Sequence, residues 1–280
     1  MKHGLVTLVC LLTLVLAAAA LAKDPAVESG WASAPILIDG KDQEWSQDAL
    51  TMDIGSNAEF AIKNDAQNLY MYFLFKSPRS STTIDFTGMR VFFDAAGKKD
   101  RDLGVRFFKK DVKAEEFIAA LEKNGETVTE EQKAEIIKRK TVTLFECEVI
   151  NKKNVPAPSD PAVQNQAPSF RSANKGRVTV YEFRIPLSRI NQPGGLGAEP
   201  GQSLKLGFEW GGMTREAMQY MNASRAEAST RAVATENSTE TMLRGGNEMG
   251  EFGGGGMDMR RDPRFKRHSF WVDVKLAAQK

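Results

Sequence analysis

The residues of this sequence best suited to chemistry lie on its last predicted strand. In the stretch Phe270–Leu276, apolar residues alternate with polar ones, which is typical of a half-buried β-strand. Trp271 falls on the polar side, together with Asp273 and Lys275. Aromatic rings stack on the C–H faces of sugars, and charged groups bind sugar hydroxyls. A tryptophan beside charged side chains on one face of a strand therefore indicates a carbohydrate-binding surface.

Three other predicted strands, in residues 89–94, 178–185 and 204–210, also carry charged residues on their polar faces. We expect these strands to align with the last one, so that the charged residues and Trp271 line one surface. The predicted ligand-binding residues are Trp271, Glu209, Arg184, Glu182, Arg90 and Asp273. An alternative stays open, in which Trp271 packs beneath residues 211–262, because large aromatic side chains usually cover apolar surface.

The composition argues against an enzyme. The chain has two histidines and two cysteines, and His3 and Cys10 fall in a predicted N-terminal signal. His268 and Cys147 then remain, which excludes an intramolecular disulfide and leaves one candidate for a catalytic triad or a histidine zinc site. With 38 Lys and Arg against 36 Asp and Glu, the charge is nearly balanced, unlike that of nucleic-acid-binding proteins. We expect no catalytic residues and no nucleic-acid partner.

Residues 1–22 resemble a secretory signal. They have a basic start, an apolar run from Leu5 to Leu21, and the small-x-small ending Ala20-Leu21-Ala22. Beyond them the longest apolar run is Leu69–Phe75, seven residues, whereas a membrane helix needs roughly 20. We expect an exported protein, periplasmic or extracellular, with no membrane span.

Short alternating segments separated by turns predict an all-β fold, an antiparallel sandwich with one wet face on each sheet. Residues 23–35 are predicted to be an extended lead-in, and residues 36–280 one β-sandwich domain. In residues 141–150 the alternation predicts that Phe145, Cys147 and Val149 point inward. Residues 151–175 contain four prolines and are predicted to be a loop. The predicted strands are 36–38, 58–63, 69–75, 89–94, 105–108, 141–150, 178–185, 204–210 and 270–276.

Two segments break this pattern and are predicted to be insertions. In residues 112–140, Phe117, Ile118 and Leu121 have helical spacing, and Thr129 with Gln132 forms a capping-box pattern. We predict a charged helix pair there. Residues 211–262 hold seven of the eleven methionines and nine of the 23 glycines, which predicts a flexible or helical insertion.

Five short motifs, in chain order, resemble those of the family 9 carbohydrate-binding modules and their secreted relatives. They are IDGKDQEW at 38–45, DAQNLY at 65–70, FFD at 92–94, YEFRIP at 181–186 and LGF at 206–208. The resemblance implies a jelly-roll-like β-sandwich. In the first motif we expect structural roles, since Asp39 can cap the turn that Gly40 permits and Trp45 can cover the end of the sandwich. The family's sugar-binders hold the ring between two tryptophans, and Trp31 and Trp210 are the remaining candidates beside Trp271.

The same resemblance brings metal ions into consideration. Relatives often carry structural calcium, and Asp94, Asp100 and Asp102 could supply oxygen ligands, although the interleaved lysines favour a solvated charged loop. Some relatives bind haem, and methionines spaced as in 218/221 and 257/259 suit Cu(I), although methionine is also a common filler of loose surfaces. We expect no cofactor; calcium is one alternative, and haem or copper a weaker one.

These observations favour a secreted, non-catalytic module that binds carbohydrate or cell-envelope glycan. A second hypothesis is an envelope scaffold protein that contacts a protein partner through residues 211–262. A third is a haem- or copper-binding redox protein.

Overall fold

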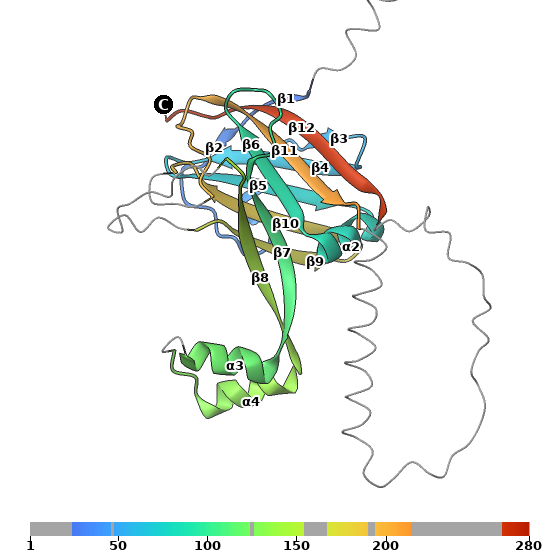
Figure 1. Ribbon diagram of the computed structural model, residues 1–280, viewed down its shortest axis with the longest axis vertical. Helices are drawn as coiled ribbons and strands as arrows, with labels where there is room; N and C mark the ends of the chain where they lie inside the picture. The colour runs from blue at the N-terminus through green and yellow to red at the C-terminus, as the bar shows by residue number, and fades with distance from the viewer. Residues whose placement is uncertain are drawn as a thin grey trace, which may run out of the picture.

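Two β-sheets pack face to face in the computed structural model, which describes residues 24–45, 48–123, 126–153, 167–189, 194–213 and 265–279 (Figure 1). Sheet A has the strand order β1 (Ala26–Glu28), β12 (Arg267–Lys275), β11 (Ser203–Gly211), β6 (Met89–Asp94), β7 (Leu103–Lys113) and β8 (Thr141–Asn151). Sheet B has the order β2 (Gly30–Trp31), β4 (Ala58–Asn64), β5 (Asn68–Phe75), β10 (Val178–Pro186) and β9 (Ser169–Lys175), and β3 (Thr51–Asp53) also pairs with β4. The predicted β-sandwich is confirmed.

The short first strands tie the two sheets together. Strand β1 pairs with β12 and β2 pairs with β4, and both pairings are parallel, whereas the other pairings are antiparallel. Between them, Ser29 lies at the crossing from one sheet to the other, and its hydroxyl accepts a hydrogen bond from the Ala277 amide at 2.8 Å. Residues 23–35, predicted to be a lead-in outside the domain, therefore contribute a strand to each sheet.

The core between the sheets follows from the alternation of the strands. Inward-facing residues of both sheets are buried, and aromatic rings dominate at the centre. Phe73 of β5 contacts Phe208 of β11 edge-on, with ring centroids 5.0 Å apart, and Phe183 of β10 at 5.9 Å. Such edge-to-face pairs add to the free energy gained from burial.

A second, smaller apolar cluster lies on the outer face of sheet B. Residues 32–45 and 48–50 cross this face, and Trp45, in the short 3₁₀ helix η1 (Gln43–Trp45), stacks on Tyr72 of β5 at 5.4 Å. The predicted strand 36–38 is wrong: Ile36 is buried and Leu37 is exposed, but the segment pairs with no strand. Its apolar residues pack on top of the sheet, which alternation alone does not distinguish from pairing within it.

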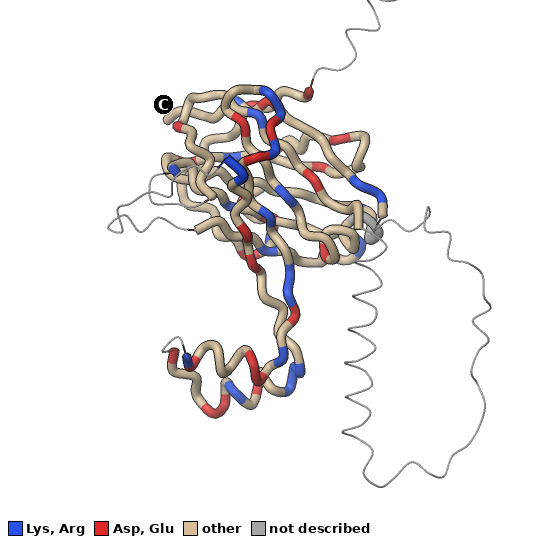
Figure 2. Tube along the Cα trace, in the orientation of Figure 1, with Lys and Arg blue, Asp and Glu red and all other residues tan. Residues whose placement is uncertain are grey.

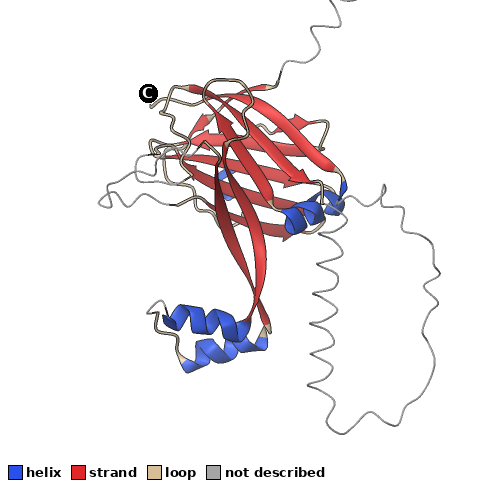
Figure 3. Ribbon diagram, in the orientation of Figure 1, coloured by secondary structure: helices blue, strands red, loops and turns tan. Residues whose placement is uncertain are grey.

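A long hairpin extends from the sandwich and carries the predicted helix pair at its tip (Figures 1 and 3). Strands β7 and β8 continue beyond the sheet, and α3 (Ala114–Lys123) and α4 (Glu130–Lys138) pack on each other there. The predicted capping box is present, since the Thr129 hydroxyl accepts from the Gln132 amide and the Gln132 side chain accepts from the Thr129 amide. Residues of both charge signs occur along the two helices (Figure 2).

Other local predictions differ from the structure. Strand β9 lies within the predicted loop 151–175, and helix α2 (Pro78–Thr87) was not predicted. Phe145, Cys147 and Val149 lie on the core-facing side of β8, as predicted, since Cys147 and Val149 pair with the buried residues Phe107 and Val105. Phe145 packs against the core, whereas Cys147 and Val149 are exposed because β8 is the edge strand of sheet A.

Two predicted segments lie wholly or mostly outside the described residues. They are the signal at 1–22 and the insertion at 211–262, of which the structure describes only 211–213. Among the described residues, no helix has the length and apolar character to cross a membrane.

Candidate binding face

The structure divides the six predicted ligand-binding residues between the two sheets. Trp271, Asp273, Glu209 and Arg90 lie on β12, β11 and β6, so all four belong to the outer face of sheet A. Glu182 and Arg184 belong to β10 in sheet B, which is the other side of the sandwich. The expectation that all six line one surface is therefore wrong, because alternation assigns a residue to a face but not to a sheet.

Glu182 has a structural environment. Its side chain is fully buried, and its carboxylate accepts hydrogen bonds from Trp45 Nε1 at 2.8 Å, from the Gly40 amide at 2.7 Å and from the Asp39 amide at 3.1 Å. Burial raises the pKa of Glu182, although these hydrogen bonds oppose the shift. Through these hydrogen bonds the carboxylate holds the motif at residues 38–45 against sheet B. Arg184 on the same strand donates to the Ala167 carbonyl at 3.1 Å.

On the outer face of sheet A, strand register sorts the side chains into three rows. The aromatic row is Trp271, Gly207, Phe92 and Gly104. The lysine row, on one side of it, is Asp273, Lys205 and Asp94. The arginine row, on the other side, is Ser269, Glu209, Arg90, Arg106 and Glu148. Neighbouring rows are about 7 Å apart, because two residues of a strand advance by that distance.

In the aromatic row, bulky rings lie over glycines. A Cβ atom at Gly207 would lie 2.7 Å from the Trp271 indole, and one at Gly104 would clash with the Val91 carbonyl oxygen and lie 3.0 Å from the Phe92 ring. Gly207 therefore provides the space for the Trp271 ring, and Gly104 allows the close approach of the β6 backbone together with the Phe92 ring. Trp271 is 8% exposed and Phe92 4%, so both rings are covered although they lie on the outer side of the sheet. Trp271 does not line an open groove here.

The β6–β7 loop folds across this face. Arg101 lies just before β7, yet its guanidinium donates to Ser269 Oγ on β12 at 3.2 Å and lies 3.5 Å from Glu209 Oε2 on β11. Neighbouring strands are about 4.8 Å apart, and β12 is three strands from β7, so the loop must reach over the sheet. Lys99 of the same loop pairs with Asp24 at 2.8 Å, beside β1.

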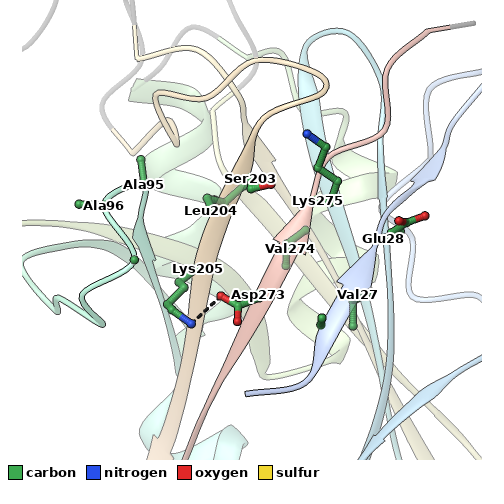
Figure 4. A pocket seen from close by; sticks show the side chains of 12 residues that line it. Val27, Glu28, Ala95, Ala96, Ser203, Leu204, Lys205, Asp273, Val274 and Lys275 are labelled. Atoms are coloured by element: carbon green, nitrogen blue, oxygen red, sulfur yellow. Dashed lines mark hydrogen bonds and ion pairs between the residues drawn. The ribbon is translucent and has the colours of Figure 1, made fainter. Parts of the chain in front are cut away.

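Between this loop and β1 lies a hollow of about 520 Å³ (Figure 4). Its walls come from β1, from residues 95–97 of the loop and from the neighbouring ends of β11 and β12. The apolar part of the lining includes the exposed residues Ala26, Ala95 and Ala96. Val27, Leu204 and Val274 also border the hollow, but they lie on the core-facing side of their strands. The polar lining residues are Glu28, Ser203, Lys205, Asp273 and Lys275. The volume falls within the range of small-ligand pockets.

Charged groups at the hollow are paired with one another. Lys205 Nζ donates to Asp273 at 2.5 Å and to Asp24 at 2.8 Å. The hydrogen bonds to Asp24 and Asp273 raise the pKa of Lys205. Burial alone would raise the pKa of Asp24, but hydrogen bonds from Lys205 and Lys99 lower it overall. Both groups are thus held in their charged forms.

Two of the three predicted calcium ligands, Asp94 and Asp100, already bind groups of the protein itself. Asp94 accepts hydrogen bonds from the backbone amides of Ala96 at 2.8 Å, Lys98 at 2.6 Å and Asp100 at 3.2 Å. Asp100 forms an ion pair with Lys153 and accepts from the Asp102 amide. In the part of the chain that the structure describes, no group of three or more His, Cys, Asp or Glu is arranged to hold a metal ion. The methionine pairs at 218/221 and 257/259 lie outside that part.

Replacement of Asp94 by asparagine is expected to lower the free energy of unfolding by about 1–2 kcal/mol at pH 7, because one charge-assisted acceptor serves three amides. Burial would raise the pKa of Asp94, but the backbone hydrogen bonds hold it below 3.8, its ordinary value. The ionised form therefore stabilises the folded state above that value, and this contribution disappears as the pH falls through the lowered pKa. Urea denaturation of both proteins from pH 7 to pH 3 should show the difference shrinking below about pH 4. A constant difference over this range would contradict the assignment.

Comparison with known proteins yields two solved structures. No family model matches the chain, and no curated protein matches it. One structure is a family 9 carbohydrate-binding module from Caldicellulosiruptor kristjanssonii in complex with glucose, 12% identical, covering 91% of this chain and 98% of that one, with a TM-score of 0.37. The other is a family 9 module of the same organism with cellotriose, 16% identical, covering 70% and 80%, with a TM-score of 0.35. The fold is similar to that of family 9 carbohydrate-binding modules. The likeness concerns the fold alone, and no residue role is transferred from it.

Sequence reasoning found part of this face. Asp273 and Lys275 were placed on the polar side of their strand, and both line the hollow. Lys205 carried the same signal, since it alternates with the core-facing residues of its strand, but it was not included in the predicted set. For Glu28 and residues 95–97, no pattern in the sequence indicates a binding role. They reach the hollow because a parallel first strand and a folded-over loop bring them there.

Proposed function

We propose that this chain is a non-catalytic glycan-binding module whose ligand lies in the hollow on the outer face of sheet A. The observation that carries the proposal is the hollow itself, about 520 Å³ and open to solvent, with charged side chains beside the small apolar residues Ala26, Ala95 and Ala96. Sugars present both kinds of surface, hydroxyl groups at their edges and C–H groups on their faces. A site that offers both kinds of contact suits them.

The polar groups of the hollow match the hydrogen-bonding capacity of hydroxyls. A hydroxyl both donates and accepts, a lysine ammonium only donates, and a carboxylate only accepts. Lys205 and Asp273 lie 2.5 Å apart, so one sugar edge could contact a donor and an acceptor together. Glu28 and Lys275 supply another acceptor and donor on the β1 side.

The ionisation of these groups supports binding without catalysis. General acid–base catalysis works best when the pKa of the catalytic group lies near the ambient pH. At the hollow, the pKa of Lys205 is raised and that of Asp24 is lowered, so both move away from neutrality. Groups held in this way can orient a ligand but are poor proton carriers at pH 7.

Trp271 supports this site in the arrangement observed. Its ring is covered and packs on Gly207, and its strand neighbour Asp273 lines the hollow. We infer that the packing of Trp271 on Gly207 holds β11 and β12 in the positions that place Lys205 and Asp273 at the hollow. Direct stacking of a sugar on Trp271 would first require movement of the β6–β7 loop.

Replacement of Asp273 by alanine is expected to weaken glycan binding about tenfold, because it removes a hydrogen-bond acceptor from the hollow and one of the two carboxylates that pair with the Lys205 ammonium. Lys205 keeps its ion pair with Asp24, so the fold should persist. Calorimetric titration against a panel of cello-, xylo- and chito-oligosaccharides and polygalacturonate measures the effect.

Glu135→Ala is the matched control, because Glu135 pairs with Lys138 on α4, far from the hollow. This variant is expected to bind glycan as tightly as the unaltered protein. Failure of the unaltered protein to bind any glycan of the panel would contradict the proposed function. Equal affinity of Asp273→Ala and Glu135→Ala would contradict the proposed location.

A further inference from the structure

A cluster of arginines on sheet A lies beside the hollow and takes no part in it. Arg90, Arg101, Arg106 and Arg267 all belong to the outer face, and we call this cluster the arginine patch. Three of the four guanidinium groups surround one buried carboxylate, that of Glu209, at 3.4 Å from Arg90, 3.5 Å from Arg101 and 2.5 Å from Arg267. The fourth, Arg106, lies 3.5 Å from Glu148.

The positive charge of the patch exceeds what these carboxylates neutralise. Among the described residues, four guanidinium groups share Glu209 and Glu148, and three of the four ion pairs are 3.4 Å or longer. Arg90 and Arg106 are also directly opposite in the strand register. Like charges opposite each other on neighbouring strands destabilise a sheet. The arrangement therefore has a cost in stability that an external anion would offset.

The patch also has unused hydrogen-bond donors. Each guanidinium carries five N–H groups in a planar fork that matches the two oxygens of a carboxylate. Arg106 Nε is buried and finds no acceptor among the described residues, although Arg106 also donates to the Thr87 carbonyl at 3.3 Å. The side chains of Arg90, Arg101, Arg106 and Arg267 are between 33% and 56% exposed, so a ligand can reach them.

The patch lies within reach of a ligand in the hollow. Along β11, Lys205 of the hollow and Glu209 of the patch are four residues apart, which is about 13 Å. Both residues face the same side of sheet A. A sugar polymer seated in the hollow could therefore extend over the β6–β7 loop, whose Arg101 is itself part of the patch, and place a substituent against the patch.

From these observations we propose that the ligand is an acidic glycan, whose carboxylates bind the arginine patch while its sugar rings occupy the hollow. This inference rests on the proposed function and specifies its substrate class. Charge complementarity carries it, since the patch presents excess positive charge and planar donors on the same face as the hollow. The patch contributes selectivity for carboxylate-bearing chains over neutral ones.

The test compares two polymers that share a backbone. Polygalacturonate carries a carboxylate on each sugar, and its methyl ester has the same backbone with the charge removed. We expect the unaltered protein to bind polygalacturonate at least about tenfold more tightly than the ester at low salt. The preference should largely disappear at about 1 M salt, where charges are screened within about 3 Å.

Variants of the arginine patch test whether the preference for polygalacturonate arises there. Arg90→Gln with Arg106→Gln should weaken polygalacturonate binding about tenfold and leave ester binding unchanged. The matched control, Lys138→Gln with Lys175→Gln, removes the same charge from α4 and sheet B, and should retain the preference. Glu209→Gln keeps the shape but removes the shared carboxylate, and should strengthen polygalacturonate binding. This variant keeps the test decisive if the double arginine variant does not fold.

Three results would overturn the inference in distinguishable ways. Equal binding of polygalacturonate and its ester would remove the selectivity and leave the proposed function standing. Poly-glutamate binding as tightly as polygalacturonate would show a general anion surface rather than a glycan site. Binding of no glycan, neutral or acidic, would remove the proposed function together with the inference.

Discussion

Replacement of Glu182 by alanine is expected to lower the free energy of unfolding by about 4 kcal/mol, one of the largest effects of any single change in this chain. The side chain is fully buried and accepts three hydrogen bonds, from Trp45 Nε1 and from the amides of Gly40 and Asp39. Alanine would leave Trp45 Nε1 and the Gly40 amide without this acceptor, and each such buried donor costs about 1–3 kcal/mol, whereas the Asp39 amide also donates to the Leu37 carbonyl at 3.1 Å. The loss should also release residues 32–45 from the outer face of sheet B.

Urea denaturation followed by tryptophan fluorescence measures this change, because Trp45 itself loses its partner. Glu182→Gln keeps one acceptor oxygen and should fall between the alanine variant and the unaltered protein. Glu148→Ala, an exposed glutamate of β8, is the control and should change the free energy of unfolding by less than about 0.5 kcal/mol. A loss below about 1 kcal/mol in Glu182→Ala would show that the carboxylate does not hold this segment.

Replacement of Gly207 by alanine is expected to destabilise the protein by about 2–3 kcal/mol, because the new methyl group would lie 2.7 Å from the Trp271 indole. The ring has to move, and with it the covering of the aromatic row. Glycine-to-alanine changes at relaxed positions have the opposite sign, stabilising by about 0.4–1 kcal/mol. Gly55 is such a position, since the nearest atom to its Cβ would be Asp53 Oδ2 at 3.6 Å, and Gly55→Ala is the matched control.

A double-mutant cycle shows whether the cost arises from the ring. In a Trp271→Val background the space above Gly207 is free, and Gly207→Ala should cost less than about 1 kcal/mol. The two changes are then strongly coupled. Equal costs with and without the indole would mean that the strain at Gly207 has another source and that Trp271 does not rest on it.

Alternation of apolar and polar residues was sufficient to predict most of the strands, because the side-chain period of a strand is directly visible in sequence. Strands β10 and β11 lie within a few residues of the bounds that alternation predicts, and β5 lies within one residue of the bounds that its continuous apolar run predicts. The capping box of α4 was also visible, since its two side chains serve backbone groups only three residues away. Interactions between residues close in sequence can therefore be predicted from the sequence itself.

Sheet membership and burial of the polar faces were not visible in this way. Glu182 and Trp271 both lie on the polar side of their strands in sequence. In the structure, however, Glu182 lies beneath residues 39–45 on sheet B and Trp271 is covered on sheet A. What covers a face is decided by segments far away in the sequence. One signal was overlooked: Gly207, in the middle of an alternating strand, is typical of a place where another group approaches closely.

The hollow shows the same limit. Asp273 could be assigned to an outer face from sequence, but its neighbours Glu28 and Ala96 come from the N-terminal part of the chain, far from it in sequence. Their meeting depends on the parallel pairing of β1 with β12 and on a loop that crosses three strands. Neither feature has a sequence pattern that specifies its partner.

Amide chemical-shift mapping with polygalacturonate oligosaccharides tests most directly whether the outer face of sheet A is a glycan-binding surface. Shifts should concentrate in residues 26–28, 95–97, 203–205 and 273–275, with a second group at the arginine patch, while β5, β9 and β10 of sheet B stay unchanged. Shifts centred on sheet B, or saturating binding of a glycan with no change at the hollow, would contradict this account.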